Sequence, residues 1–181
     1  MPVICSPRPD GSRAYNNTHG RKRMHMAQTY TIRKATIMDV RHIYTLLRDY
    51  ADRGVLLGRS LSDLYDQIRD FSVAVDGASG RMLGICGLHI CWEEFAEIRS
   101  LAVTAEAKGR GIGRALVEAC QVEAVALGIT RLFVLTYVPE FFKKLGFDPV
   151  DKAILPHKVW RDCITCVKFP DCDEESLIKA L

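Results

Sequence analysis

The sequence predicts a mixed α+β fold in which a central, twisted and mostly antiparallel sheet is flanked by helices. Two observations support this prediction. Between residues 29 and 150, strand-like and helix-like stretches follow one another in the order strand, helix, helix, three strands, helix, strand, helix, strand. Over residues 97–128, one of these strands leads through a glycine-rich turn directly into an amphipathic helix. A chain of 181 residues, 48% of them apolar, suits one domain with a full core.

The first part of this domain supplies one strand and two helices. Residues 29–34 alternate between apolar and polar side chains, which is typical of a strand with one buried face. Thr36 and Asp39 form a capping-box variant that opens the first helix. Ser60 and Asp63 repeat this pattern and open the second helix.

The middle of the domain is predicted to form three strands. Residues 71–75 and 83–92 are predicted to be antiparallel, because the stretch 76–80 between them has the composition of a turn. Residues 97–103 form the strand that precedes the glycine-rich turn.

The last part alternates helices with strands. Apolar side chains from Ile112 onward recur at helical spacing as far as Gly128. Residues 131–136 are predicted to be a buried strand, and residues 139–145 a short helix before a final strand. No internal repeat or second domain is visible.

The glycine-rich turn has the properties of an anion site. Glycine can adopt positive φ and let a ligand approach the backbone, and the first turn of a helix leaves N–H groups unpaired. The residues expected at this site are Lys108, Gly109, Arg110, Gly111, Ile112, Gly113 and Arg114. A dinucleotide fingerprint requires a different spacing of its last glycine, and a P-loop requires a closing Gly-Lys-Ser/Thr that this turn lacks. The alternative is a tight loop with ordinary surface cations.

Glu97 is a charged residue inside an otherwise apolar strand. Strict alternation would place its side chain on the same face as Arg99, Leu101 and Val103. A carboxylate in such a place must be paired, hydrated or functional. The alternatives to a functional role are a salt bridge to Arg99 and a strand at the sheet edge.

Residues 108–113 resemble the Q/R-x-x-G-x-G/A signature of the GCN5-related N-acetyltransferases, with Lys in the first position. The order of elements also matches the fold of that family. The resemblance implies acetyl-CoA as cosubstrate, its pyrophosphate on the amides of the turn and its pantetheine arm along Leu101, Ala102 and Val103. It further implies acetyl transfer from a thioester to an amine, with Glu97 as the general base.

Several longer stretches resemble the acetyltransferase domain of bacterial N-acetylglutamate synthases. They are residues 32–36, 54–60, 96–103, 131–136, 146–151 and 155–156. This resemblance covers about residues 30 to 158 and implies L-glutamate as the acceptor. The longer synthases also carry an amino-acid-kinase domain, for which this chain has no room. It therefore resembles the short, free-standing form.

Glutamate bears two carboxylates, so its site should supply cations with forked donors. The resemblance implies a substrate contact for Arg33, and Arg59 also falls on an arginine of the family. Arg99 and its neighbour Ser100 are further candidates for substrate binding. Five basic residues are candidates by charge alone, with a solvated surface position as the alternative for each: Arg59, Arg99, Lys152, Lys158 and Arg161.

The resemblance does not identify the general acid. Many enzymes of this fold protonate the leaving thiolate with a Tyr in the helix before Gly-Phe. Phe142 stands at that position here, and Tyr137 is a substitute candidate with a packing role as its alternative. Backbone dipoles and water could also stabilise the thiolate.

The segment 157–172 contains a cluster of sulfur and imidazole side chains. His157, Cys163, Cys166 and Cys172 could supply four zinc ligands, a redox-sensitive pair or simply reduced thiols. We predict no metal from this signal. The other cysteines within element patterns are expected in the core: Cys86, Cys91 and Cys120.

Residues 1–28 are predicted to be a disordered basic tail, for which Met24 and Met26 are alternative starts of the protein. The tail has a net charge of +4 and residues 29–181 have −1, so the domain is not expected to bind nucleic acid. There is no signal peptide and no apolar run long enough to cross a membrane, which predicts a cytoplasmic protein. The oligomeric state stays open, with a homodimer as one alternative.

Together these observations predict an acetyl-CoA-dependent N-acetyltransferase that acts on L-glutamate, in the first step of arginine synthesis. One alternative is acetylation of another small amine or of a protein N-terminus. The other is a non-catalytic CoA-binding module that regulates a partner.

Overall fold

The computed structural model describes residues 30–155, 164 and 171–181, and within them seven strands form one sheet. The strands are β1 (Tyr30–Lys34), β2 (Phe71–Asp76), β3 (Met82–Ile90), β4 (Phe95–Val103), β5 (Arg131–Thr136), β6 (Asp148–Pro149) and β7 (Glu175–Ala180). The α-helices are α1 (Val40–Ala51), α2 (Leu61–Asp66), α3 (Ile112–Ala126) and α4 (Pro139–Lys143). Four 3-10 turns complete the described elements: η1 (Ile37–Asp39), η2 (Ile68–Asp70), η3 (Ala105–Ala107) and η4 (Lys152–Ile154).

The strands follow one another across the sheet in the order β1-β2-β3-β4-β5-β7-β6. Every neighbouring pair among the described strands is antiparallel except β4 and β5, which run parallel. The predicted α+β fold with a mixed, mostly antiparallel sheet is therefore confirmed.

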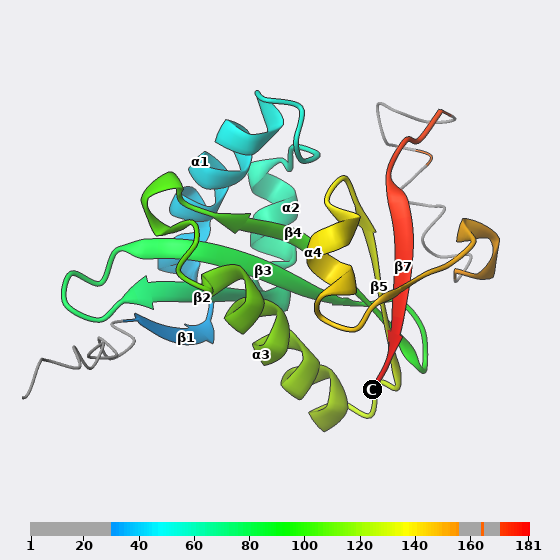
Figure 1. Ribbon diagram of the computed structural model, residues 1–181. Coiled ribbons are helices and arrows are strands. Elements are labelled where there is room, and N and C mark those ends of the chain that lie inside the picture. Colours follow the sequence, from blue (N-terminus) through cyan, green and yellow to red (C-terminus); the bar gives the residue numbers. More distant parts are fainter. Residues whose placement is uncertain (1–29, 156–163, 165–170) are drawn as a thin grey trace, which may run out of the picture.

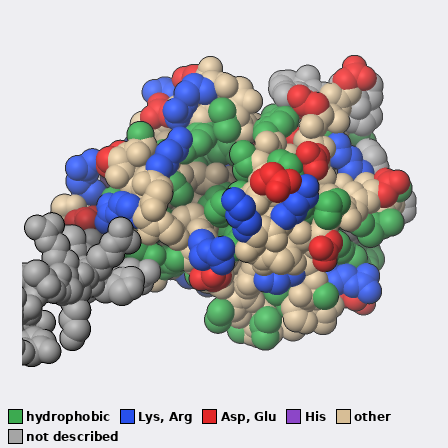
Figure 2. Space-filling view, in the orientation of Figure 1, with side chains coloured by type: hydrophobic (Ala, Val, Ile, Leu, Met, Phe, Trp, Pro, Cys, Tyr) green, Lys and Arg blue, Asp and Glu red, His purple; other side chains and the backbone are tan. Residues whose placement is uncertain are grey.

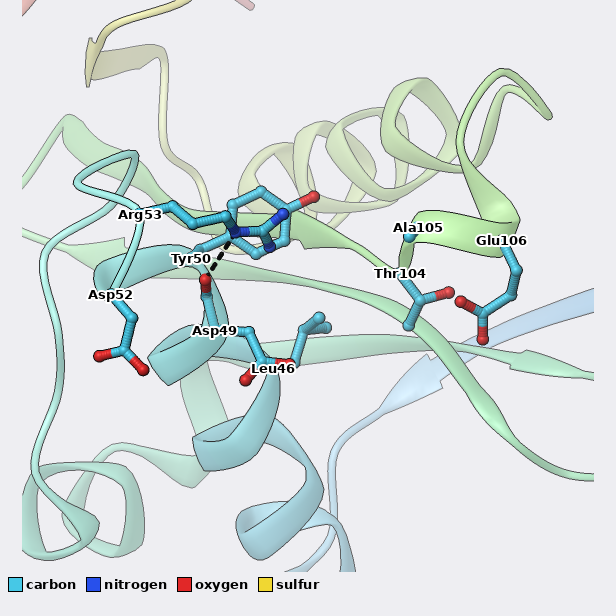
Figure 3. A pocket seen from close by; sticks show the side chains of 8 residues that line it. All are labelled: Leu46, Asp49, Tyr50, Asp52, Arg53, Thr104, Ala105 and Glu106. Carbon is cyan, nitrogen blue, oxygen red and sulfur yellow. Dashed lines mark hydrogen bonds between the residues drawn. The ribbon is translucent and has the colours of Figure 1, made fainter.

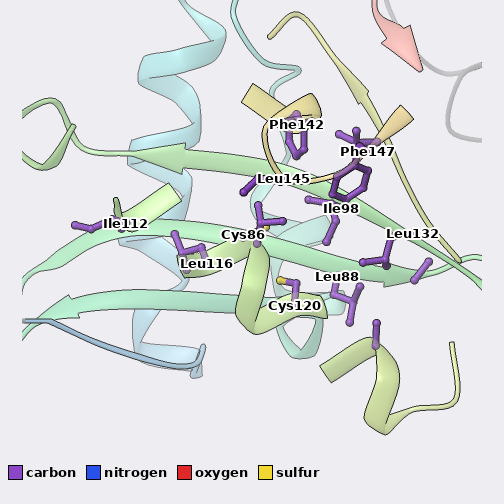
Figure 4. Close-up of a cluster of buried hydrophobic side chains, with 14 of the residues drawn as sticks. Cys86, Leu88, Ile98, Ile112, Leu116, Cys120, Leu132, Phe142, Leu145 and Phe147 are labelled. Atoms are coloured by element: carbon purple, nitrogen blue, oxygen red, sulfur yellow. The ribbon is translucent and has the colours of Figure 1, made fainter. Parts of the chain in front are cut away.

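Helices cover both faces of the sheet (Figure 1). On one face, α3 packs through Ile112, Leu116 and Cys120 onto the apolar side chains of β3 and β4 (Figure 4). On the other face, α1 and α2 pack a second core around Ile43 and Leu64. The sheet thus separates these two cores, and a strand residue can be assigned to the α3 face or to the α1/α2 face. A third, smaller cluster forms around Phe95 and Phe133.

Both predicted capping boxes are present. The Asp63 amide donates to the Ser60 hydroxyl over 3.1 Å, while the Asp63 carboxylate accepts the Ser60 amide. Asp39 accepts the amide of Thr36 in the same way, but the first turn after it is the 3-10 turn η1 rather than α-helix. The sequence pattern located both starts because the reciprocal bonds are local.

The sequence did not predict β7, which inserts between β5 and the short strand β6. Its Leu177 is fully buried, although Glu175 and Lys179 give the segment a polar appearance. The three cysteines expected in the core are indeed buried: Cys86, Cys91 and Cys120. No helix among residues 30–155 combines the length and the apolar character needed to cross a membrane.

Candidate active site

The parallel strands β4 and β5 pair over only three residues. Phe95 to Glu97 pair with Arg131 to Phe133, and the register ends there. Beyond Glu97, β4 continues to Val103 with β3 along one edge, while no described strand pairs with its other edge. The two strands therefore part at Glu97, and the backbone of Leu101 and Val103 lies along the opening.

A β-bulge interrupts β4 at Ser100. Its φ is +53°, and the pairing with β3 shifts between Ile85 and Gly87 at the same level. A bulge adds one residue to a strand and turns the following side chains to the opposite face. The bulge explains why the strand does not follow strict alternation.

The expectation that Glu97 shares a face with Leu101 and Val103 is wrong for this reason. Leu101 and Val103 pack against the core on the α3 face. Glu97 lies between Ala96 and Ile98, which belong to the α3 face, so its own side chain is on the α1/α2 face. Arg99 is on that face too, because its guanidinium donates hydrogen bonds to side chains of the segment that follows α2.

The Glu97 side chain is mostly buried, with 15% of its surface exposed. One of its oxygens, Oε2, lies 3.9 Å from Nη1 of Arg99, so the predicted ion pair exists but is long. The carboxylate stands at the level where β4 leaves β5. It is thus close to the opening, and Arg99 is one of its charged neighbours.

Arg99 is held by groups that sequence reasoning missed. Its Nη2 donates to Oε1 of Gln67 over 2.6 Å and to Oδ2 of Asp70 over 3.0 Å. His89 Nδ1 lies 2.7 Å from the same Asp70 oxygen. The sequence held one signal for His89. It and Glu97 flank the short connection between β3 and β4, and the antiparallel register of this hairpin pairs them.

Arg59, in the loop between α1 and α2, joins the same group. Its Nε donates to Oγ of Ser100 over 2.8 Å, and its Nη1 donates to Oε1 of Gln67 over 3.2 Å. The structure therefore brings together four of the predicted site residues around the bulge: Arg59, Glu97, Arg99 and Ser100.

Arg33 does not lie with this group. It is on β1, at the far edge of the sheet, with β2 and β3 between it and β4. Its guanidinium forms two bonds with the Asp39 carboxylate, of 2.7 and 3.0 Å. This hydrogen-bonded pair lowers the pKa of Asp39 to about 2 and raises that of Arg33. Here the arginine supports the start of η1.

The glycine-rich turn has the backbone shape expected of an anion site. Gly109 and Gly111 have φ of +75° and +78°, which confirms that the turn uses glycine's conformational freedom. Gly111 is the N-cap residue of α3 and, as a glycine, has no side chain to bond the first amides of the helix. The first intrahelical bond runs from the Ala115 amide to the Gly111 carbonyl. A Cβ at Gly109 or Gly111 would meet no atom within 4 Å, so there is room above the turn.

Cations surround the turn, as Figure 2 shows for the face on which α3 begins. The Lys108 ammonium lies 5.4 Å from the centre of the Tyr50 ring. Arg114 reaches Glu118 at 3.4 Å and the Lys144 carbonyl at 3.3 Å, and Arg110 is exposed.

An open hollow of about 570 Å³ lies between the end of α1 and the segment after β4 (Figure 3). Tyr50 of α1 and Arg53 just after this helix line one side of it, and Thr104 and Glu106 line the other side. The Tyr50 hydroxyl also donates to the Val103 carbonyl over 2.6 Å. This contact joins α1 to the end of β4.

The two aromatic candidates for a general acid have different surroundings. Phe142 is only 2% exposed and packs edge-on against Phe141 and Phe147. The Tyr137 hydroxyl donates to Asp173 over 2.9 Å. The position of the family's tyrosine is thus filled by a core side chain.

The predicted sulfur cluster falls largely outside the described residues. His157, Cys163 and Cys166, with Lys158 and Arg161, lie in that part. Cys172 lies within the described residues and is a free thiol. Its backbone carbonyl accepts a hydrogen bond from Nζ of Lys152. Among the described residues, no group of three or more His, Cys, Asp or Glu side chains could hold a metal ion. The tail of residues 1–28 is also outside the described part.

Residues 40–147 match the family model described as the acetyltransferase (GNAT) family. An uncharacterized N-acetyltransferase of Chlorobaculum tepidum is 39% identical over 150 residues, which cover 83% of this chain and 96% of the relative. An amino-acid acetyltransferase of Mycobacterium tuberculosis is 36% identical over 66% of this chain and 69% of the relative.

A solved structure of N-acetylglutamate synthase from Neisseria gonorrhoeae, complexed with coenzyme A and N-acetylglutamate, has a similar fold. It superposes with a TM-score of 0.77 at 30% identity and covers 84% of this chain. This chain spans only 35% of the length of that synthase. The similarity thus concerns one part of the larger protein.

Proposed function

The chain belongs to the acetyltransferase (GNAT) family and is an acyltransferase, and from this premise we propose that it transfers the acetyl group of acetyl-CoA to the amine of L-glutamate. The observation that carries the proposal is the position of Glu97. Its carboxylate stands where β4 separates from β5, beside two arginines and a bulge. The proposed base Glu97, the opening between β4 and β5, and cations that could bind an amine bearing carboxylates therefore lie at the same level of the sheet.

The coenzyme would bind along the free edge of β4 and over the glycine-rich turn. The amides at the start of α3 and the dipole of this 15-residue helix favour a diphosphate there. Gly109 and Gly111 leave room for it, and Lys108, Arg110 and Arg114 add positive charge. The open backbone from Leu101 to Val103 would pair with the pantetheine arm, which has amides of its own.

The reaction requires an uncharged amine and a leaving thiolate. Glu97 would take one proton from the ammonium group, directly or through a water molecule. The amine nitrogen then attacks the thioester carbonyl, so that a C–N bond forms, the C–S bond breaks and the electron pair leaves on sulfur. Because Phe142 is buried in the core, a tyrosine acid is absent from its usual place, and the sulfur would take its proton from solvent.

The acceptor's carboxylates would bind next to Arg59 and Ser100. Arg59 comes from a loop and is only half-buried, so its guanidinium borders the opening. Arg99, with 5% of its side chain exposed, is better placed to hold neighbouring side chains than to bind a ligand. Arg33 would serve the start of η1 through Asp39. These assignments revise the sequence expectation for two of the three arginines.

The decisive experiment measures thiol release from acetyl-CoA with glutamate, aspartate, glutamine, ornithine and polyamines as acceptors. We expect glutamate to give the highest kcat/KM. In Glu97→Gln, kcat with glutamate should fall by roughly 10² to 10⁴, the usual contribution of a general base, while CoA binding measured by calorimetry stays unchanged. A loss of less than about tenfold would remove Glu97 from this role. A higher kcat/KM for an uncharged or cationic acceptor would overturn the glutamate assignment.

A further inference from the structure

Two carboxylates share the Arg99 guanidinium on the α1/α2 face of the sheet. Asp70 Oδ2 lies 3.0 Å from Nη2, and Glu97 Oε2 lies 3.9 Å from Nη1. The arginine itself is nearly fully buried. Its charge is thus divided between the catalytic base of the proposed function and a second acid that lies closer to it.

Asp70 is held in this position from the opposite side. His89 Nδ1 lies 2.7 Å from the same Oδ2 that meets Arg99. His89 is the cross-strand partner of Glu97, and Asp70 directly precedes β2, so the fold places the three side chains next to one another. Asp70 and His89 also line an open hollow of about 580 Å³ at the edge of the domain.

We propose that Asp70, oriented by His89, is a positioning residue that draws the Arg99 guanidinium away from Glu97 and so keeps the Glu97 carboxylate a strong enough base. This inference rests on the proposed function, because it presumes that Glu97 accepts the proton. It adds residues that the family resemblance and the comparisons do not name.

The physical argument is one of competing charges. A guanidinium close to a carboxylate favours its ionised form and weakens it as a base, whereas a second carboxylate on the same guanidinium opposes that effect. A base is most effective when its pKa approaches the working pH. An arginine bound mainly to Glu97 would therefore slow proton removal, and Asp70 prevents this.

Other charged groups lie near Asp70 and His89. Lys34 is paired with Glu123 at 2.9 Å at the edge of the hollow, and Arg69 also lines it. On the inner side, Arg59 and Arg99 both donate to Oε1 of Gln67. Among the described residues, Asp70 is the carboxylate that contacts Arg99 at hydrogen-bonding distance.

The test is the pH dependence of kcat for Asp70→Asn, with Asp66→Asn as the control. Asp66 is exposed on α2, so its substitution removes one negative charge from the same segment without touching Arg99. In Asp70→Asn the acidic limb of the profile should move to lower pH by about half a unit to one unit, because a carboxylate that competes with Glu97 for the guanidinium is lost. The maximal kcat should fall several-fold, roughly, as the base weakens. The control should keep the wild-type profile.

A second pair of variants keeps both carboxylates and guards against misfolding of the first. His89→Ala removes the imidazole that contacts Asp70, and it should move the acidic limb of the pH profile in the same direction by a smaller amount. His89→Gln retains an N–H donor and should restore the wild-type position of the limb. An acidic limb that stays in place or moves to higher pH in both Asp70→Asn and His89→Ala overturns the inference. If kcat of Glu97→Gln were nevertheless strongly reduced, Glu97 would keep its role as the base and the proposed function would stand. If kcat of Glu97→Gln were close to that of wild type, neither the inference nor the role of Glu97 would stand.

Discussion

The hydroxyl of Tyr50 in α1 donates a hydrogen bond of 2.6 Å to the carbonyl oxygen of Val103, the last residue of β4. The same ring lies under the Lys108 ammonium, at the start of the glycine-rich turn. One side chain therefore fixes both the free edge of β4 and the approach to α3. The two places proposed to bind the pantetheine arm and the diphosphate are thus tied to a single helix.

Tyr50→Phe should weaken both the fold and the binding of coenzyme. Loss of a neutral hydrogen bond should lower the free energy of unfolding by about 1 kcal/mol in urea titrations. The Kd for CoA, measured by calorimetry, should rise roughly threefold because the strand end is less preorganised. Tyr65→Phe, on the exposed side of α2, is the control and should change neither value. An unchanged Kd in Tyr50→Phe would limit the contact to a role in stability.

Gly111→Ala should separate backbone strain from ligand binding when it is compared with Gly80→Ala. Both glycines have positive φ, of +78° and +68°, and at both a Cβ would meet no atom within 4 Å. Each substitution should therefore cost about 1 kcal/mol of stability. Gly80 lies in the turn between β2 and β3, whereas a methyl group on Gly111 would point into the room left for the diphosphate.

We accordingly expect the Kd for CoA to rise about tenfold or more in Gly111→Ala and to stay unchanged in Gly80→Ala, since only the former blocks the helix N-terminus. Equal Kd values for the two variants would place the diphosphate elsewhere.

Arg33→Gln tests whether the first-strand arginine serves the fold or the substrate. The Arg33 partner holds the pKa of Asp39 at about 2 instead of its ordinary 3.8. A depressed pKa stabilises the folded state above the unfolded value and loses this contribution as pH falls through the folded value. The shift corresponds to about 2 kcal/mol.

The variant should therefore be less stable than wild type at pH 7 by up to about 2 kcal/mol, and the gap should close between pH 4 and pH 2 as Asp39 becomes protonated. Denaturant titrations at a series of pH values would measure this. The KM for glutamate should stay within about twofold of wild type, because an interaction remote from the acceptor removes no binding energy. A large rise in KM with constant stability would return Arg33 to the substrate site.

The sequence predicted most of the fold because the decisive signals are local. The capping box at Ser60, the positive φ at Gly111 and the apolar period of α3 each depend on residues within a turn or two. The strand β7 gave no such signal, since only its pairing with β5 buries Leu177 between polar neighbours. Long-range pairing decides elements of that kind.

The candidate site was only partly predictable for the same reason. Glu97 and the turn stood out as a charge in an apolar strand and as a glycine pattern. The bulge at Ser100 did not, because a serine at positive φ has no sequence signature, and it turned Leu101 away from the face of Glu97. Asp70 and His89 are distant in sequence and meet only through the order of the strands.

Arg59 is the best placed of the predicted arginines to bind a carboxylate of the acceptor. Its Nε and Nη1 are fixed by Ser100 and Gln67, so the guanidinium is oriented before a ligand arrives. A forked, charge-assisted contact with a carboxylate is worth about 1.5 to 3 kcal/mol, which corresponds to roughly ten- to a hundredfold in affinity. Arg59→Gln should therefore raise the KM for glutamate by at least about tenfold, with the KM for acetyl-CoA unchanged.

Two further variants sharpen this prediction. Arg59→Lys keeps the charge but loses the fork, so its KM for glutamate should also rise, although its preference for glutamate over glutamine should persist better than in Arg59→Gln. Arg41→Gln, on the exposed side of α1, removes a positive charge away from the opening and should behave like wild type. If Arg59→Gln and Arg41→Gln had the same KM for glutamate, the acceptor's carboxylates would have to bind to other cations.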